Sequence, residues 1–195
     1  MSAMAGKIAA LRIFPLKSAR GVEPAAVAFA AYGPVGDRSY SVVDPEGNPL
    51  KAKQYPAIAE ITPVEVGFEL PGGQGLCRAQ AEREVAVIDP VLSKLLGTAA
   101  RIVGVEPEEQ TTSLTKVAPV HLVSSGNQEP RANVVVEWPP ASGDSVAVPW
   151  DIGDRLRLGA EVEIELTSTP RHCAGIYGRV AVPGTARLGD TVQKI

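Results

Sequence analysis

The sequence predicts a mainly β fold, of the sandwich or barrel type, with one short helix. Three observations support this prediction. Apolar and polar residues alternate with a period of two through many short segments, which is typical of half-buried strands. The 19 glycines and 17 prolines are many for a helical bundle, and they separate these segments at short intervals. Only one segment has the apolar spacing of a helix.

The N-terminal half is expected to contain strands that end at proline, glycine or a polar turn. Pro15 ends the first of them, because proline cannot donate a ladder hydrogen bond. A later strand runs into the turn cluster DPEGNP at residues 44–49, and residues 50–54 are expected to return as its hairpin partner. The strands expected in this half are residues 7–14, 26–32, 38–44, 50–54, 57–66, 75–79 and 84–88.

The one predicted helix covers residues 89–97. Asp89 is a favourable N-cap, Pro90 suits the first helical position, and Gly97 suits the C-terminal cap. Its apolar residues, 91, 92, 95 and 96, lie on one face. A helix this short needs to dock on a sheet to persist.

The C-terminal half is expected to be all strand and loop. Residues 106–116 are polar and are predicted to form a linker, and residues 138–150 contain three prolines and are predicted to form a loop. The strands expected here are residues 101–105, 119–123, 133–136, 155–158, 161–167, 175–182 and 187–194.

Composition excludes several classes of protein. The net charge of -3 excludes a generally basic nucleic-acid binder but allows a local basic pocket. No apolar stretch approaches the roughly 20 residues that a membrane span needs, so we expect none. Cys77 and Cys173, the only cysteines, form no CxxC pair. We therefore expect neither a cysteine-based zinc site nor a disulfide framework, and a reducing, cytoplasmic location.

Two cationic elements in the N-terminal half are candidates for binding an anion. Lys17 and Ser18 follow a strand end in FPLKSARG, where an ammonium and a hydroxyl could bind a phosphate. Arg38 follows Gly36 and Asp37 at the start of a strand. The alternatives are a solvated loop for the first element and an ordinary surface pair of Asp37 with Arg38 for the second.

A third cationic element lies in the C-terminal half. Arg131 and Asn133 precede the β-branched run VVV, which is typical of a buried strand, so both are expected at a sheet rim. Rim positions are where loops build binding sites, although each of these signals is weak by itself.

Cys173 is the candidate nucleophile or soft metal ligand. It lies in PRHC, where Arg171 and His172 should stabilise its thiolate and lower its pKa. The alternative is a buried structural cysteine, which is what we expect of Cys77 in its strand context. His121, on an apolar strand, is expected to be a hydrogen-bonded structural residue.

No other common catalytic motif is present. The sequence contains no GxSxG, P-loop, HExxH, or GxGxxG after a strand, so nucleotide-dependent and zinc-protease functions have no support. A Cys-His hydrolase is also disfavoured, because adjacent residues of an extended chain point apart.

Taken in order, these elements resemble the MOSC family. FPLKSARG resembles the YPVKSCRG signature of the N-terminal β-barrel domain that accompanies MOSC domains, and YGPVGDRSYSVVDPEGNPL resembles its GDRxWxVVDxxG stretch. QYPAIAEI resembles its next strand. APVHLVS, RANVVV, TPRHC and YGRVAVPGTARLGDTV follow in the order of the MOSC domain proper. The resemblance runs from about residue 7 to residue 192 and implies a β-barrel fold in two domains, 1–105 (MOSC N-terminal type) and 106–195 (MOSC).

The resemblance also implies a function and a site. MOSC proteins include the C-terminal domain of molybdenum cofactor sulfurases and the mitochondrial amidoxime-reducing component, which binds molybdenum cofactor (molybdopterin) and reduces N-hydroxylated compounds. The resemblance implies that Cys173 is the molybdenum ligand and the catalytic residue. It also implies a small-molecule substrate and an electron-donor protein as partners. The implied cofactor contacts are Lys17, Ser18, Arg38, Arg131, Asn133 and Arg171, and we expect Lys17, Arg38, Arg131 and Cys173 to face one cleft.

The sequence leaves three functions open. The chain could be an oxidoreductase for N-oxygenated compounds, a sulfur carrier with a persulfide on Cys173, or a non-catalytic MOSC module that binds a small anion or a protein partner. Departures from the family pattern favour the last: KAK at 51–53 replaces Thr-x-Arg, and the segment after residue 124 is too short for the usual helix. The joint presence of the candidate cations and Cys173 favours the first two.

Overall fold

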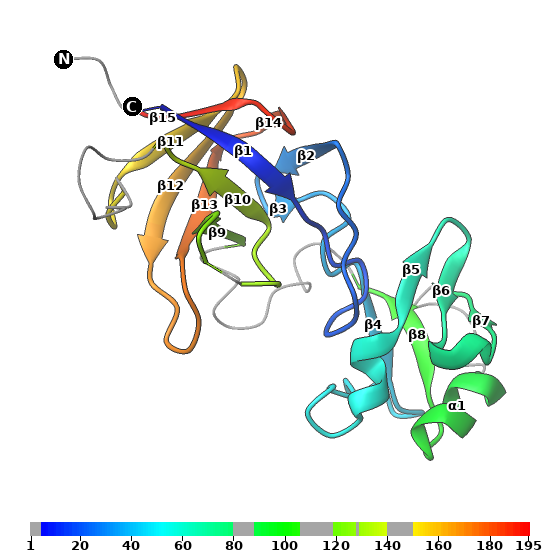
Figure 1. The fold of residues 1–195 in the computed structure, drawn as a ribbon. Coiled ribbons are helices and arrows are strands. Elements are labelled where there is room, and N and C mark those ends of the chain that lie inside the picture. Colours follow the sequence, from blue (N-terminus) through cyan, green and yellow to red (C-terminus); the bar gives the residue numbers. More distant parts are fainter. Residues whose placement is uncertain (1–4, 80–87, 106–118, 128, 140–149) are drawn as a thin grey trace. The chain divides into compact units, whose positions relative to one another are not determined.

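The computed structural model describes residues 5–79, 88–105, 119–127, 129–139 and 150–195 (Figure 1). These residues form a mainly β structure with a closed seven-stranded barrel and one short α-helix, which confirms the predicted fold class. The chain divides into two compact units. The barrel unit comprises Met1–Arg12, Glu23–Val35 and Thr111–Ile195, and the inserted unit comprises Ile13–Val22 and Gly36–Gln110.

The barrel is closed by its first strand. β1 (Ala5–Leu11) pairs with β10 (Val134–Glu137) on one side and with β15 (Thr191–Lys194) on the other. The strand order is β1-β10-β9-β13-β12-β11-β15. The remaining strands are β9 (Val120–Ser124), β11 (Arg155–Leu158), β12 (Val162–Ser168) and β13 (Ile176–Val182). Closure leaves the sheet without an exposed edge.

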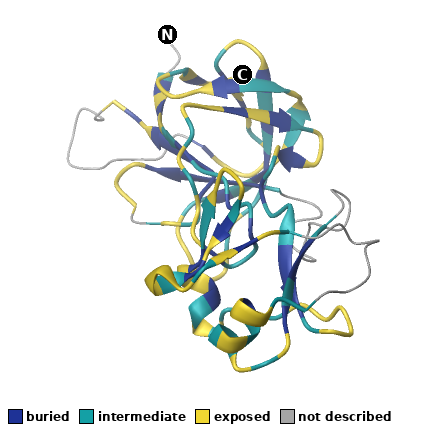
Figure 2. Cartoon of the chain, turned by 90° about the vertical axis from the view of Figure 1, so that its right-hand side faces the viewer, coloured by how far each residue is buried: buried dark blue, intermediate teal, exposed yellow. Residues whose placement is uncertain are grey.

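Alternation along the strands builds the barrel core. In β11 and β12 every second residue is buried and the others are partly or fully exposed (Figure 2). The buried residues are aliphatic, and those at 1% exposure or less include Ile8, Leu11, Leu122, Val134, Val136, Leu156, Leu158, Ile164, Leu166 and Val192. Aliphatic side chains therefore fill the barrel, as the low aromatic content requires.

A small second sheet completes the barrel unit, in the order β14-β2-β3. Its strands are β14 (Gly184–Arg187), β2 (Ala26–Ala30) and β3 (Gly33–Pro34). The prediction of one strand over residues 187–194 is wrong, because a turn at Gly189 (φ 84°) separates β14 from β15. The segment therefore contributes β14 to the small sheet and β15 to the barrel.

The inserted unit has its own core between short strands and helices. β4 (Tyr40–Val43) pairs with β8 (Arg101–Gly104), and β5 (Thr62–Val64), β6 (Gly67–Glu69) and β7 (Leu76–Cys77) form a second sheet. Two 3-10 helices cover Pro56–Glu60 and Pro71–Gly73. The core residues include Leu16, Ile58, Ile61, Leu70, Leu92 and Ile102.

The predicted helix is confirmed as α1 (Pro90–Leu96). The Asp89 carboxylate accepts hydrogen bonds from the amides of Val91 (2.9 Å) and Leu92 (2.8 Å). Gly97 ends the helix with φ 68°, which is the left-handed conformation that glycine adopts without strain. Leu92 is fully buried, so this short helix is stabilised by packing as expected.

Two strand predictions in the inserted unit are wrong. Residues 50–54 form no strand: Pro49 makes an isolated bridge to Val43 and the Leu50 amide donates to the Val42 carbonyl (2.9 Å), but the pairing ends there, and the strand that pairs along β4 is β8. The β-branched residues of β8 fit a buried sheet better than the polar run KAKQ. Residues 57–66 begin as a 3-10 helix because Pro56 starts a helical turn.

Three expectations fall wholly or mostly outside the described residues: the strand at 84–88, the linker at 106–116 and the loop at 138–150. The compact units also differ from the expected division at residue 105, because β1 and residues 23–35 pack with the C-terminal strands. Two consecutive family domains stay a prediction. Within the part of the chain that the structure describes, no helix is long and apolar enough to cross a membrane.

Candidate functional site

The first candidate site lies in the inserted unit, around Lys17. Leu16 is fully buried and bridges to Tyr40, and the amide of Lys17 donates to the Tyr40 carbonyl (3.0 Å). These contacts fix the backbone on both sides of Lys17. Lys17 follows the buried Leu16, and its side chain lines a cavity of about 200 Å³.

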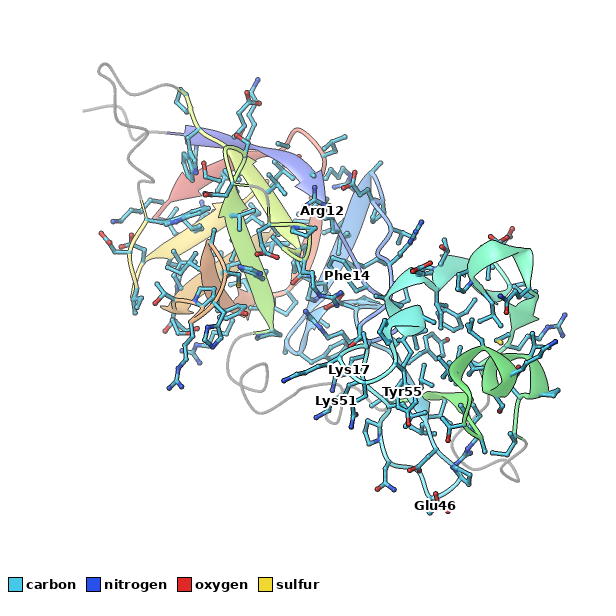
Figure 3. All side chains as sticks on the ribbon, turned by 60° about the horizontal axis from the view of Figure 1, so that its bottom comes forward. Arg12, Phe14, Lys17, Glu46, Lys51 and Tyr55 are labelled. Atoms are coloured by element: carbon cyan, nitrogen blue, oxygen red, sulfur yellow. The ribbon has the colours of Figure 1, made fainter. Side chains whose placement is uncertain are left out.

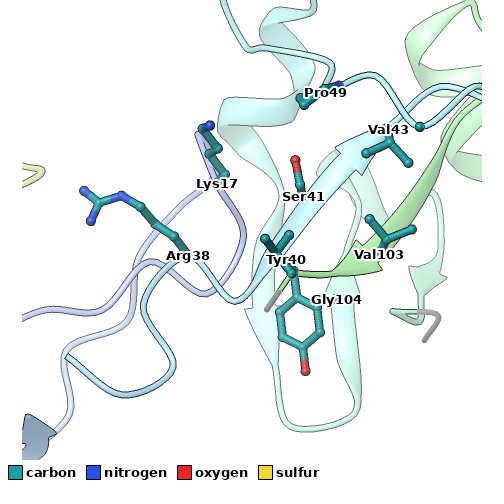
Figure 4. A pocket seen from close by; sticks show the side chains of 10 residues that line it. Lys17, Arg38, Tyr40, Ser41, Val43, Pro49, Val103 and Gly104 are labelled. Carbon is teal, nitrogen blue, oxygen red and sulfur yellow. The ribbon is translucent and has the colours of Figure 1, made fainter. Parts of the chain in front are cut away.

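One face of the β4–β8 ribbon forms the wall of this cavity. Ser41 lies opposite Val103 in the ladder, and Val43 follows Ser41 on the same face. Figure 4 shows the Lys17 and Ser41 side chains beside this stretch of β4, with the Tyr40 ring directed away from Ser41. Ser41 is buried (7% exposed), and its hydroxyl donates a long hydrogen bond of 3.5 Å to the Val42 carbonyl.

The cavity has a positive electrostatic character. Burial lowers the pKa of Lys17, and the nearby charges of Lys51 and Arg38 lower it further. Lys17 and Lys51 lie close together in Figure 3. Among the residues that the structure describes, no Asp or Glu lines this cavity. Like charges therefore crowd Lys17, and an anion bound beside it would relieve their repulsion.

Two predicted site residues have an unusual backbone. Among the described residues that are not glycine, only Ser18 (φ 71°) and Arg38 (φ 54°) have a positive φ. This left-handed conformation costs about 1–2 kcal/mol for an ordinary residue. Strained residues of this kind cluster at ligand sites. Both were singled out from the sequence for their chemistry, and the backbone gives an independent reason to consider them functional.

Asp37 holds Arg38 in place. The Arg38 guanidinium donates to the Asp37 carboxylate, whose other oxygen accepts from the Phe14 amide (2.7 Å). Asp37 is only 5% exposed, so the pair is not the ordinary surface ion pair that the sequence left open. A buried carboxylate that also caps a backbone amide positions the arginine beside Lys17.

The second candidate site lies in the barrel unit, around Asn133. Its side chain is 1% exposed. The Oδ1 atom accepts from the amide of His121 (3.1 Å), and the Nδ2 atom donates to the carbonyl of Arg12 (3.2 Å). These bonds tie β9 to the end of β1 and give Asn133 a structural task that its sequence context did not show. Its role as a cofactor contact stays a prediction.

The loop between β12 and β13 carries Cys173 and is anchored to β9. His121 Nε2 donates to the carbonyl of Ala174 (2.8 Å), which confirms the expected structural role of this histidine. Gly175 has φ 100°, and a Cβ there would meet the Leu122 carbonyl oxygen and lie 2.5 Å from Val123 Cγ1. Only glycine fits this close approach of the loop to the strand.

The expected lowering of the Cys173 pKa is contradicted. Cys173 is exposed, yet its thiol pKa is raised, first by partial burial and then by the charge of Glu129. A hydrogen bond with Glu129 raises it further, whereas one with Tyr177 lowers it. Arg171 and His172 are themselves exposed, so water screens their charges. The prediction failed because it omitted partial burial of the thiol and the charge of Glu129, which is distant in sequence.

Glu129 links Cys173 to Arg131. Its carboxylate accepts from the amide of Arg131 (3.1 Å), and its carbonyl accepts from the Arg12 guanidinium (3.2 Å). The sequence did not single out Glu129, Lys51 or Tyr177 as site residues: Lys51 lies in KAK and Tyr177 opens YGRVAVPGTARLGDTV, but neither segment shows which charge or thiol its side chain meets. Cys77 differs sharply: it is 1% exposed, and burial followed by Asp89 raises its pKa to about 12, which fits the expected inert thiol.

The structure therefore divides the predicted residues between the two units. Lys17 and Arg38 line one cavity of the inserted unit, with Ser18 next in the chain. The others, Arg131, Asn133, Arg171 and Cys173, belong to the barrel unit. The expectation of a single cleft joins residues of both units and stays a prediction. Within the described residues, no cluster of three or more His, Cys, Asp or Glu could hold a metal ion.

Comparison with known families bears on the predicted residues of the inserted unit. Residues 5–87 match the MOSC N-terminal beta barrel domain. The match supports the MOSC family, and it includes Lys17, Ser18 and Arg38. The matched MOSC N-terminal segment extends over both units, because it contains β1 and β2 of the barrel unit as well as β4–β7 of the inserted unit.

Comparison with solved structures finds chains of similar fold. The YUAD protein from Bacillus subtilis superimposes with a TM-score of 0.47 and 12% sequence identity, over 98% of this chain and 96% of that chain. A search of curated proteins finds no match.

Proposed function

We propose that the chain binds the molybdenum cofactor, the phosphate-bearing pterin that is associated with MOSC proteins. The observation that carries this proposal is the group of like charges around Lys17, in a cavity to whose lining the described residues contribute no carboxylate. A phosphate beside Lys17 and Arg38 would receive charge-assisted hydrogen bonds, which are roughly twice as strong as neutral ones. The positive φ of Ser18 and Arg38 supports the same location.

The residues present fit the anionic end of such a cofactor. A cavity of about 200 Å³ is smaller than the roughly 300–1,000 Å³ of drug-sized ligand pockets, so it accommodates a phosphate rather than a whole pterin. The buried Ser41 lines the same wall, and its hydroxyl could donate a further hydrogen bond. Lys17, Ser18 and Arg38 are therefore the residues we place at the phosphate.

Cys173 is the residue we place at the metal, with Arg131, Asn133 and Arg171 as further contacts of the cofactor. Its exposure leaves the sulfur accessible, and a thiolate is a suitable soft ligand for a metal that is already held by sulfur. Because its thiol pKa is raised, metal binding must release a proton, and binding should strengthen as the pH rises.

Two activities are compatible with this site. With the cofactor bound, molybdenum would supply oxygen-atom removal from N-oxygenated compounds, and a partner protein would supply the electrons. In the other activity, Cys173 would carry sulfur as a persulfide. Intact-mass measurement of freshly purified protein separates them: a sulfur carrier shows a fraction one sulfur atom heavier that a reductant removes, and the Cys173→Ser variant lacks it.

Cofactor content tests the proposal directly. Protein from a host that makes molybdenum cofactor is expected to contain molybdenum and pterin together. Lys17→Met and Arg38→Asn should each weaken binding by roughly ten- to a hundredfold, since one charge-assisted bond contributes about 1.5–3 kcal/mol. Asn is chosen at position 38 because it tolerates a positive φ.

Lys94→Met is the matched control, because Lys94 is an exposed lysine of α1 outside the cavity and its loss changes the net charge equally. Wild-type protein without molybdenum and pterin would overturn the proposal. Equal cofactor content in Lys17→Met and Lys94→Met would show that the ligand is placed wrongly.

The small cavity supports a second candidate function. A non-catalytic module that binds a free anion needs no more than the Lys17 cavity, and its size matches that simpler ligand. Protein that binds inorganic phosphate or pyrophosphate in calorimetry, loses this binding in Lys17→Met, and contains neither molybdenum nor pterin would establish this function instead.

A further inference from the structure

We infer that a second cavity, at the base of the loop that carries Cys173, binds a small organic cation with an apolar body. This cavity has a volume of about 430 Å³, within the range of small-molecule sites. It belongs to the barrel unit and is lined by Trp150, Asp151, Ile152, Thr169, Gly175 and Ile176. No motif in the sequence pointed to it.

Apolar side chains form part of the wall of this cavity, and packing holds two of them in place. Trp150 is 9% exposed and makes an edge-to-face contact with Trp138, with ring centroids 5.5 Å apart, so its ring has a set orientation. Ile176, the first residue of β13, is 3% exposed. Ile152 is 58% exposed, so the surface of its side chain is available to a ligand.

Asp151 gives the cavity its charge preference. Among the described residues, no cation pairs with the Asp151 carboxylate. Its neighbour Asp154 differs, because it accepts from the Asp151 amide (2.7 Å) and pairs with Lys194 (2.7 Å). One aspartate thus stabilises the turn, while the other lines the cavity and has no ion-pair partner among the described residues. Arg171, on the adjoining loop, does not line it.

The chemistry of these groups selects the ligand. A carboxylate favours a cation, an indole face attracts a cation through its quadrupole, and the aliphatic walls favour an apolar body. Thr169 can add one hydrogen bond, since its hydroxyl can donate or accept. An aryl- or alkylammonium of modest size meets all of these conditions, whereas an anion would be repelled by Asp151.

The position of the cavity suggests its use. Thr169 and Gly175 line it from the two ends of the loop that contains Cys173. Gly175 is held against β9, so this side of the cavity keeps its place. A bound cation would lie beside that loop, as a substrate must if Cys173 takes part in its conversion. The binding site stands by itself, and only its use as a substrate pocket rests on the proposed function.

Three ligands with one benzene ring and different charges test the inference. Titration of the full-length protein with benzylammonium, benzyl alcohol and benzoate, followed by NMR or calorimetry, should show tightest binding for benzylammonium and weakest for benzoate. Asp151→Asn should weaken benzylammonium binding about two- to fivefold, as for a partly solvated ion pair, and remove its advantage over benzyl alcohol. Ile152→Ser should weaken benzylammonium and benzyl alcohol by similar factors.

Glu69→Gln is the matched control, because it removes one exposed carboxylate of the inserted unit and should leave binding unchanged. The inference is overturned if benzylammonium does not bind saturably, if benzoate binds equally well, or if Asp151→Asn behaves like Glu69→Gln. Cofactor content, measured on the same samples, separates this result from the proposed function: a protein without cofactor that still prefers benzylammonium retains the site and loses the proposed reaction.

Discussion

The two candidate sites of this protein have opposite electrostatic characters. In the inserted unit, Lys17 lies near two other cations, and its pKa is lowered. In the barrel unit, Cys173 lies near the Glu129 carboxylate, and its pKa is raised. In each case partial burial and a neighbour of like sign disfavour the charged form. A bound anion would offset the repulsion among the cations at the first site. At the second site, a metal ion that replaces the thiol proton would offset the repulsion between the thiolate and Glu129.

The two regions also differ in how their backbone is held. Around Lys17 the strain is concentrated in two non-glycine residues with positive φ, Ser18 and Arg38. At the Cys173 loop a glycine relieves it, since Gly175 approaches β9 more closely than any side chain allows. The first arrangement costs stability and is typical of ligand sites, while the second is typical of an anchor that supports a site.

The largest effect is expected from Gly175→Ala. The substitution places a Cβ against Leu122 and Val123 and also imposes a positive φ on alanine. Strain and overpacking each cost about 1–3 kcal/mol, so the free energy of unfolding should fall by about 3 kcal/mol or more. Urea denaturation measures this loss.

Gly153→Ala separates the two causes. Gly153 has a similar φ (95°), but a Cβ there would have no neighbour within 4 Å. The free energy of unfolding of this control variant should fall only by the cost of backbone strain, about 1–2 kcal/mol. Equal losses in the two variants would mean that the loop is not anchored by its close approach to β9.

The next largest effect concerns pH and Cys77. Its pKa is raised from 9.0 to about 12 in the folded protein, so folding favours the neutral thiol. The resulting stability is fully present below pH 9 and is lost as the pH rises from 9 towards 12, by at most about 1.4 kcal/mol per pH unit.

Comparison of the wild type with Cys77→Ala isolates this contribution, because all other titrating groups are shared. The free energy of unfolding of the variant should start lower, owing to the lost side chain, but fall less steeply above pH 9. Parallel pH profiles would show that Cys77 titrates equally in the folded and unfolded chains.

A smaller effect is expected from Glu129→Gln. Without the carboxylate charge the pKa of Cys173 should fall, and its alkylation at neutral pH should accelerate several-fold, because the thiolate is the reacting form. Mass spectrometry after brief alkylation should find Cys173 modified before Cys77 in both proteins.

Glu137→Gln serves as the control, since it removes an exposed carboxylate of β10. An unchanged rate in Glu129→Gln would show that Glu129 does not control the thiol. Labelling of Cys77 before Cys173 would contradict the contrast between an exposed and a buried cysteine.

The sequence predicted the fold better than the sites. Period-two alternation located most strands, and local capping chemistry located α1, because both signals are contained within a few neighbouring residues. The strand predicted at 50–54 is absent because pairing with β4 ends after Pro49 and Leu50, whereas the partner that does pair along β4 is β8, which is distant in sequence. Lys17 and Arg38 lie in recognisable sequence motifs, and both line one cavity. Glu129 carried none, and its effect on Cys173 arises only when the chain brings them together.

The smallest expected effect sharpens the electrostatic contrast at Lys17. Lys51→Met removes one of the two charges that lower the pKa of Lys17, so that pKa should rise. The neutral amine then becomes rarer at neutral pH, and acetylation of Lys17 by acetic anhydride should slow by up to about fivefold, the equivalent of ~1 kcal/mol for a partly exposed pair. Lys94→Met should leave the rate unchanged. Saturating inorganic phosphate should slow the same reaction in the wild type, because a bound anion both stabilises the ammonium and covers it. Acetylation of Lys17 at one rate in all of these samples would mean that the three cations do not interact, and the electrostatic argument for an anion at this cavity would fail with it.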